Sequence, residues 1–137
     1  MKTIDTLFEE QFRKIKERGW EHIYVIVDMH DTVFKSTYGN DQKLIPYDLA
    51  VDCLMKLSYR KDVKLIYWSS TNETEQKRHL EYLSGYNINF DYINENPEEA
   101  STSYADFDKK FYMNVILDDK AGFDPNEDWF ELYLYLM

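Results

Sequence analysis

The sequence has little of three features that would point to particular classes of protein. Its single cysteine, Cys53, cannot form an intramolecular disulfide or a thiolate zinc site, which fits a reducing compartment. Only 16 lysine and arginine residues stand against 26 aspartate and glutamate residues, so the formal charge is -10 and a nucleic-acid backbone is an unlikely partner. No apolar run is long enough for a membrane helix, and charges interrupt the N-terminal segment too often for a signal peptide. We therefore expect a soluble, cytoplasmic protein.

The composition nevertheless has what a folded domain requires. Hydrophobic residues make up 44% of the 137 residues and aromatic residues 17%. A chain of this length buries roughly two thirds of the surface that it exposes when unfolded, which is enough for one core. We see no internal repeat and no composition shift, so residues 1–137 are expected to form one domain.

Segments typical of strands alternate with segments typical of helices. The strand segments are continuous runs of β-branched and aromatic residues, as in strands buried on both faces, and comprise residues 22–28, 63–69, 89–93 and 113–119. The helical segments have apolar residues at helical spacing and comprise residues 4–18, 50–57, 72–84 and a last helix that begins at Asp124-Pro125. Residues 94–108 are expected to form a loop with one helical turn at most. This order predicts a three-layer α/β/α, Rossmann-like fold with an open parallel sheet.

Three of the predicted strands end on polar residues. These are Asp28, Ser69 and the pair Asp118-Asp119. Ligands of open α/β sheets bind beyond the carboxyl ends of the strands, so these residues should meet at one edge. Acids that meet there repel each other unless a cation or a proton compensates, and carboxylate oxygens suit Mg²⁺. Because Mg²⁺ keeps positions open for water and phosphate, phosphoryl chemistry is the natural hypothesis; the alternative is that each acid merely caps a strand or helix.

Three segments resemble, in the correct order, the motifs of the haloacid dehalogenase (HAD) superfamily. VIVDMHDTVF at 25–34 is similar to the first motif, a hydrophobic strand followed by Asp-x-Asp-x-Thr. LIYWS at 65–69 is similar to the second, a strand that ends in Ser or Thr. KFYMNVILDD at 110–119 resembles the third and fourth together, a lysine shortly before a strand that ends in two acids. The resemblance extends from about residue 22 to residue 122 and implies a HAD-like fold.

The resemblance also implies catalytic roles for individual residues. Asp28 would be the nucleophile that attacks phosphorus and becomes an aspartyl phosphate. Ser69 and Ser70 would bind the phosphoryl oxygens. Lys110 would neutralise charge on both the phosphate and Asp28, with Lys109 as a possible substitute.

The metal ligands implied by the family pattern are Asp28, the main-chain carbonyl of His30, Asp118 and, directly or through water, Asp119. His30 is the departure from that pattern, since the family usually has a second aspartate there that protonates the leaving group and then activates water. A histidine is a competent general acid or base, although a neighbouring cation disfavours its protonated form. Asp31 occupies a position where the family usually has a small residue, and its side chain should point elsewhere.

These residues predict a Mg²⁺-dependent phosphohydrolase, and three outcomes remain open for its turnover. His30 serves as acid and base in a working phosphatase, or the aspartyl phosphate hydrolyses slowly and favours transfer, or the site binds metal and phosphate without turnover. A receiver-like or flavodoxin-like domain is a further alternative, although a receiver places its paired acids after the first strand. The phosphorylated substrate is a small metabolite, a nucleotide or a larger molecule, and the sequence does not choose among these.

A large cap domain does not fit between the motifs. The 40 residues between Asp28 and Ser69 already contain a helix and a strand, and the segment from Lys35 to Tyr47 is enough only for a flap over the site. Capless members of the family tend to act on large substrates or to gain a lid from a neighbouring subunit. The last helix is expected to pack on the core, but Trp129 and Tyr133 exposed together would make it a candidate for homodimer formation.

Overall fold

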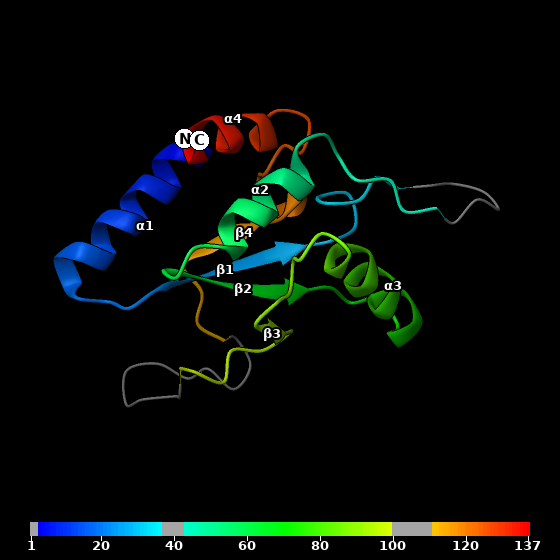
Figure 1. The fold of residues 1–137 in the computed structure, drawn as a ribbon, viewed down its shortest axis with the longest axis horizontal. Helices are drawn as coiled ribbons and strands as arrows, with labels where there is room; N and C mark the ends of the chain where they lie inside the picture. The colour runs from blue at the N-terminus through cyan, green and yellow to red at the C-terminus, as the bar shows by residue number, and fades with distance from the viewer. Residues whose placement is uncertain (1–2, 37–42, 100–110) are drawn as a thin grey trace.

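The protein forms an open, all-parallel α/β sheet, as the sequence predicts. The structure is a computed structural model, and it describes residues 3–36, 43–99 and 111–137. In chain order the elements are α1 (Ile4–Arg18), β1 (Ile23–Asp28), α2 (Ala50–Ser58), β2 (Val63–Trp68), α3 (Glu73–Ser84), β3 (Tyr92–Ile93), β4 (Val115–Leu117), the short 3₁₀ helix η1 (Asp119–Ala121) and α4 (Asp128–Leu136). The sheet order is β3-β2-β1-β4, and the arrows of β1 and β2 point to the same edge (Figure 1).

One face of the sheet carries a core to which all four helices contribute. The alternate residues of β1 and β2 that point to this face are fully or almost fully buried, as expected for a strand whose side chains alternate between faces. They are Ile23, Val25, Val27, Val63, Leu65 and Tyr67, and the helices add Ile4, Phe8, Ala50, Cys53, Leu54, Leu57, Leu83, Trp129 and Leu132. Burial of this apolar surface is the main term that stabilises the fold.

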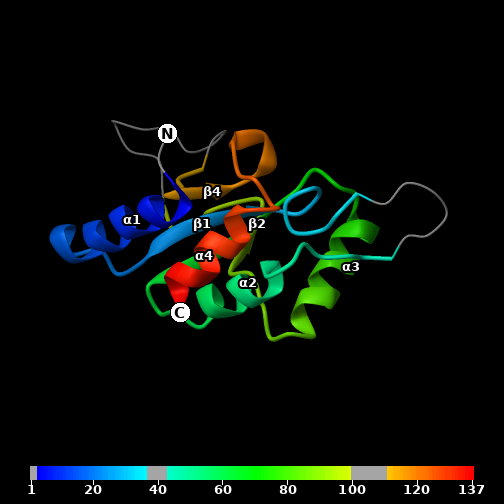
Figure 2. The same ribbon diagram turned by 90° about the horizontal axis from the view of Figure 1, so that it is seen from above.

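The connection from β3 to β4 crosses the opposite face of the sheet. Right-handed crossovers from β1 to β2 and from β2 to β3 place α2 and α3 on one side, as Figure 2 shows. The return to β4 runs in the opposite direction across two strands, and its described parts lie on the other side, where Glu98 contacts Tyr24 and Phe111 contacts Trp68. Its described parts, residues 94–99 and 111–114, contain no helix, in line with the predicted loop, and residues 100–108 of that loop lie outside the described part of the chain.

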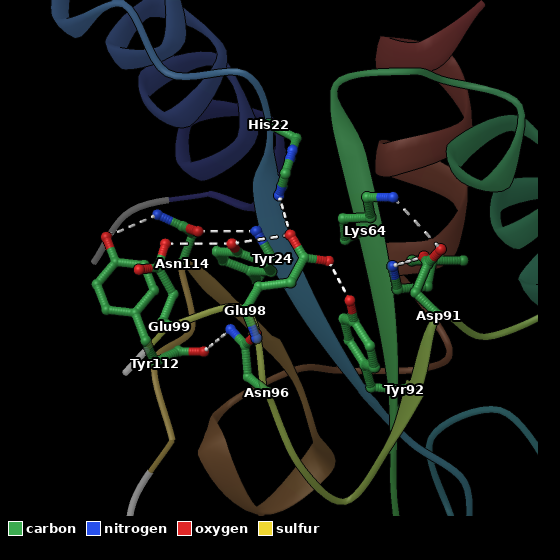
Figure 3. Close-up of polar contacts among 11 residues, drawn as sticks. His22, Tyr24, Lys64, Asp91, Tyr92, Asn96, Glu98, Glu99, Tyr112 and Asn114 are labelled. Carbon is green, nitrogen blue, oxygen red and sulfur yellow. Dashed lines mark hydrogen bonds and ion pairs between the residues drawn. The ribbon is translucent and has the colours of Figure 1, made fainter. Parts of the chain in front are cut away.

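Glu98 ties this connection to the amino edge of the sheet. Its Oε1 accepts hydrogen bonds from His22 Nε2 at 2.8 Å and from the Tyr24 hydroxyl at 3.3 Å, and its Oε2 accepts one from the Tyr92 hydroxyl at 2.5 Å (Figure 3). Burial alone would raise the pKa of Glu98, but the bond from Tyr92 and the charge and hydrogen bond of His22 outweigh it and lower that pKa. The carboxylate is thus stabilised as an anion in a structural role.

Side-chain oxygens of Asp91 and Asn114 replace backbone acceptors just before β3 and β4 begin. The Leu65 carbonyl accepts a hydrogen bond from Asp91 N, and Leu65 N donates one to the Asp91 carboxylate, each at 2.8 Å. Asn114 binds Tyr24 in the same two-sided way, at 2.9 Å through its main-chain N–H and at 2.7 Å through its side-chain oxygen. Because a side chain replaces the next backbone acceptor, β3 and β4 begin later than the predicted segments 89–93 and 113–119. β4 also ends early, at Leu117, because Asp118 caps η1.

The ends of the helices follow local chemistry, with one difference from the prediction. The Asn72 side chain accepts from Glu75 N at 2.9 Å, as the capping box predicts, and Gly19 ends α1 in the left-handed conformation that glycine adopts without strain. The last helix begins at Asp128 rather than at Asp124-Pro125. The reason is a separate turn, in which Asp124 N donates to the Asp128 carboxylate at 2.7 Å before the helix starts.

The fold bears on the predicted flap and on the predicted dimerisation surface of the last helix. The arms of the predicted flap lie side by side, since Lys35 N donates to the Ile45 carbonyl and Tyr47 N to the Val33 carbonyl, both at 2.8 Å. Trp129 is fully buried, so the condition for a dimerisation stripe on α4 is not met. In the described parts of the chain, no helix has both the length and the apolar character needed to cross a membrane.

Candidate active site

Three carboxylates meet at the carboxyl edge of the sheet. β1 ends at Asp28, and because Val27 pairs with Leu117, the last residue of β4, Asp118 follows directly beyond the neighbouring strand. Asp28, Asp118 and Asp119 each offer one oxygen, and these oxygens lie within 4.8 Å of one another. We call this set the acidic triad. The convergence of strand ends that the sequence suggested is therefore present in the structure for the three acids.

The Thr32 hydroxyl lies among the oxygens of the acidic triad. It accepts a hydrogen bond from Asp119 N at 2.9 Å and is 3.1 Å from Asp28 Oδ2 and 3.2 Å from Asp119 Oδ1. Its single proton can serve only one of these carboxylates at a time. Asp118 Oδ1 accepts from Lys120 N at 2.9 Å, which fixes that side chain at the start of η1.

The electrostatics of the triad favour a bound cation or proton. Burial, followed by the negative charge of Asp118, raises the pKa of Asp28 to about 7, although the hydrogen bond from Thr32 acts in the opposite direction. A cation bridging the carboxylates would remove this repulsion, and a donor set made only of half-buried oxygens fits a hard cation rather than a soft one. The triad could therefore hold a metal ion.

A tight turn after β1 brings Thr32 back to the triad. The Met29 carbonyl accepts from the amides of residues 32–34 at 2.9 to 3.3 Å, and Asp31 has the positive φ of 60° that such a turn requires. Trp129 fixes the turn from the core side, because its Nε1 donates to the Thr32 carbonyl at 2.8 Å. The first motif is thus a rigid turn between the end of β1 and α4.

The same turn places His30 on the surface. Its side chain is 68% exposed, and its Nε2 lies 2.9 Å from the Ser36 hydroxyl and 3.6 Å from Asp31 Oδ2. The Asp31 carboxylate also accepts hydrogen bonds from the hydroxyl and the main-chain N–H of Ser36. The predicted acid and base therefore binds a serine of the flap arm, and Asp31 is directed to that serine.

Ser69 lies at the predicted edge, one residue beyond the end of β2. Asn94 holds its backbone from both sides, since Asn94 Oδ1 accepts from Ser69 N at 2.9 Å and Asn94 Nδ2 donates to the Ser69 carbonyl at 3.0 Å. The Ser69 hydroxyl bonds Thr71 instead, at 3.2 Å to its N–H and 3.1 Å to its hydroxyl. Ser70 is exposed. Asn94 thus fixes the main chain of Ser69 at this edge, while the Ser69 hydroxyl is hydrogen-bonded to Thr71 in the following turn.

Sequence reasoning gave no role to Thr32, Ser36 or Asn94. Thr32 stands in the Asp-x-Asp-x-Thr pattern, so the same motif contained the signal. Asn94 directly follows the third strand, and the rule that identified Asp28 as a polar strand end would have identified it too. Ser36 had no signal, because its contact with His30 depends on the path of the turn. The predicted Lys110, and its substitute Lys109, lie outside the described residues.

Comparisons with known proteins add a likeness at the level of fold. No family model matches the chain, and no curated protein matches it. A solved structure of a conserved protein from Bacteroides thetaiotaomicron is similar, with a TM-score of 0.61 and 22% identity over 82% of this chain and 87% of that one. This likeness shows the fold alone. It supports the parallel α/β arrangement described above.

Proposed function

We propose that the protein is a Mg²⁺-dependent phosphohydrolase of the haloacid dehalogenase type that works through an aspartyl phosphate on Asp28. The observation that supports this most is the acidic triad, in which carboxylates from the ends of β1 and β4 lie within 4.8 Å of one another. The described parts of the three HAD-like motifs lie along β1, β2 and β4 and the turns that follow these strands. Asp28, Asp118 and the His30 carbonyl would hold the ion, with Asp119 direct or through water.

The reaction consists of two displacements at phosphorus. A carboxylate oxygen of Asp28 attacks phosphorus, the bond to the leaving oxygen breaks, and that oxygen takes up a proton. A water molecule then attacks the aspartyl phosphate, loses a proton, and releases inorganic phosphate and the Asp28 carboxylate. Mg²⁺ would supply charge stabilisation for the transferring phosphoryl group. Thr32 orients the Asp28 carboxylate, and Lys110 would add positive charge to the phosphate.

The proton transfers are assigned to His30, and its position favours a second candidate function. Its ring binds Ser36 and is largely exposed, so it must turn toward the leaving oxygen to act. If it does not, the aspartyl phosphate hydrolyses slowly and passes to another acceptor, or the site only binds Mg²⁺ and phosphate. These are the slow phosphotransferase and the binding-protein alternatives.

The decisive experiment is a phosphatase assay with p-nitrophenyl phosphate in Mg²⁺ and in chelator. We expect activity only with Mg²⁺, and a loss on the order of 10³-fold or more in Asp28→Asn. Asp48→Asn, an exposed acid before α2, is the matched control and should stay within about two-fold of the wild type. Activity that survives in Asp28→Asn contradicts the nucleophile assignment.

His30 variants separate the phosphatase from its alternatives. His30→Ala should slow turnover by about 10²- to 10⁴-fold if His30 is the acid and base. An inactive wild-type protein that becomes active as His30→Asp would instead identify an impaired enzyme. If acid quenching traps Asp28 in its phosphorylated form, because phosphorylation is faster than hydrolysis, the phosphotransferase alternative is favoured.

A further inference from the structure

Trp68 stands beside the proposed nucleophile in the last row of the sheet. The parallel register pairs Asp28 with Trp68 of β2, and on its other side the register places Asp118 beside Asp28. Directly paired residues of neighbouring strands point to the same face, and such strands lie about 4.8 Å apart. The row therefore has an indole on one side of the nucleophile and the remaining metal-binding carboxylates on the other.

Trp68 is partly exposed to solvent although it lies on a face of the sheet. Its neighbour on the same face of β2, Ile66, is fully buried, whereas Trp68 remains 41% exposed. Phe111, from the connection that crosses this face, lies with its ring centroid 5.5 Å from that of Trp68 at an interplanar angle of 66°. The two rings, which we call the aromatic wall, leave part of the indole open to solvent at the edge of the site.

We propose that the aromatic wall binds a planar aromatic group of the substrate, so that the substrates are aryl phosphates or nucleoside monophosphates rather than phosphosugars. This rests on the proposed function, because it takes the phosphoryl group to be held at Asp28. Asp118 and Asp119, which would hold the cation together with Asp28, lie on the β4 side of the nucleophile. On the β2 side, among the described residues, the partly exposed indole of Trp68 is available to stack on a ring of the rest of the ester.

The charge of the site makes an apolar contact valuable there. Specific recognition by hydrogen bonds to carboxylates would compete with the metal, whereas stacking on an indole uses the face of the ring and tolerates different substituents. An aryl phosphate has its ring directly on the leaving oxygen, and a nucleoside monophosphate has its base one ribose away. Both place a planar group within the reach of the neighbouring strand.

The test compares kcat/KM of the Mg²⁺-loaded full chain for phenyl phosphate, AMP and glycerol 3-phosphate. The wild-type protein should prefer phenyl phosphate, AMP or both over glycerol 3-phosphate. Trp68→Leu should lower that preference by about 10- to 100-fold, mainly through KM, and Trp68→Phe should restore most of it. Tyr59→Leu, which removes a 66% exposed ring next to the amino end of β2, is the control and should keep the preference. The two aromatic esters distinguish an aryl from a nucleotide source.

The outcomes separate this inference from the proposed function. If Trp68→Leu changes kcat/KM equally for aromatic and glycerol esters, or changes neither, the aromatic wall has no role in selection and the inference is overturned. If no ester is hydrolysed, the proposed function fails, and calorimetric binding to the Mg²⁺ form replaces the kinetics. Tighter binding of phenyl phosphate than of glycerol 3-phosphate, lost in Trp68→Leu, would then support the inference, and equal binding would overturn it.

Discussion

The two edges of the sheet both gather carboxylates, but they treat them in opposite ways. At the amino edge, Glu98 receives hydrogen bonds from His22 and Tyr92 and shares the Tyr24 hydroxyl with Glu99, and its pKa is lowered. At the carboxyl edge, burial and the charge of Asp118 raise the pKa of Asp28 to about 7. The protein stabilises the Glu98 carboxylate as an anion but does not do so for Asp28.

The difference lies in the number of donors rather than in the number of acids. The hydroxyl of Thr32 has one proton for Asp28 and Asp119, whereas Glu98 has a separate donor group on each of its oxygens. A carboxylate with its own donors serves the fold. Asp28 has only the shared Thr32 hydroxyl and lies beside the charge of Asp118, so a cation or a proton would compensate its charge; among the described residues we therefore propose the carboxyl edge as the metal site.

The largest effect should come from removing a ligand at the carboxyl edge. Mg²⁺ at 100 times its dissociation constant should stabilise the wild-type protein by about 2.7 kcal/mol. Asp118→Asn should lose most of this gain, because one of three carboxylates is gone, and it should be no less stable than the wild type in chelator, because repulsion is relieved. Thermal unfolding with chelator and with Mg²⁺ measures both. Glu98→Gln is the control that should keep the Mg²⁺ response; an unchanged response in Asp118→Asn would remove Asp118 from the site.

Thr32→Val should weaken Mg²⁺ binding by about 10- to 100-fold, as is typical when a group that orients metal ligands is lost. Valine keeps the shape of this fully buried side chain but cannot accept from Asp119 N or donate to Asp28. Calorimetric titration of Mg²⁺ gives the affinity. Thr32→Ser, which keeps the hydroxyl, should stay close to the wild type, and equal affinities in the valine and serine variants would show that the hydroxyl does not orient the triad.

Glu98→Ala should lower the free energy of unfolding by about 1–3 kcal/mol, because His22 and Tyr92 lose their acceptor, whereas the Tyr24 hydroxyl keeps Glu99 as an acceptor at 3.1 Å. Denaturant unfolding in chelator measures this cost. The matched control is Glu95→Ala, an exposed acid of the same segment, which should change stability by no more than about 0.5 kcal/mol. A Mg²⁺ response altered in Glu98→Ala would contradict the separation of the two edges.

The sequence predicted best those features that depend on long, uniform patterns. β1 and β2 lie within one residue of their expected bounds, because each is a nearly continuous apolar run that is buried along most of its length. The expected meeting of Asp28 with Asp118 and Asp119 followed from parallel topology alone. Neither result depends on the contacts of a single side chain.

Features that depend on single side chains could not be predicted. β3 is short because the Asp91 carboxylate, not a further strand residue, binds Leu65 N, and no periodicity reveals that choice. The engagement of His30 with Ser36 depends on a turn with positive φ at Asp31, which the motif does not specify. Sequence patterns therefore do not predict the structure where side chains compete with backbone acceptors.

The most direct comparison of the edges is the pH dependence of stability in chelator. The pKa of Asp28 is raised above its ordinary 3.8, so the folded state binds more protons than the unfolded state, and Asp28 makes stability fall as pH rises from about 4 to about 7. The pKa of Glu98 is lowered from 4.5, so its contribution is present above that pH and is lost as pH falls below it. The two carboxylates should therefore oppose each other.

Denaturant unfolding of three proteins from pH 3.5 to pH 8 resolves the two contributions. The stability of Asp28→Asn relative to the wild type should increase between pH 4 and pH 7 and then level off, whereas the deficit of Glu98→Gln should shrink as pH falls below about 4.5. Mg²⁺ should abolish the first trend, because a bound cation favours the Asp28 anion, and should leave the second unchanged. Parallel pH profiles for the two variants would mean that the edges do not differ in how they compensate charge, and the assignment of metal binding to the carboxyl edge would lose its electrostatic basis.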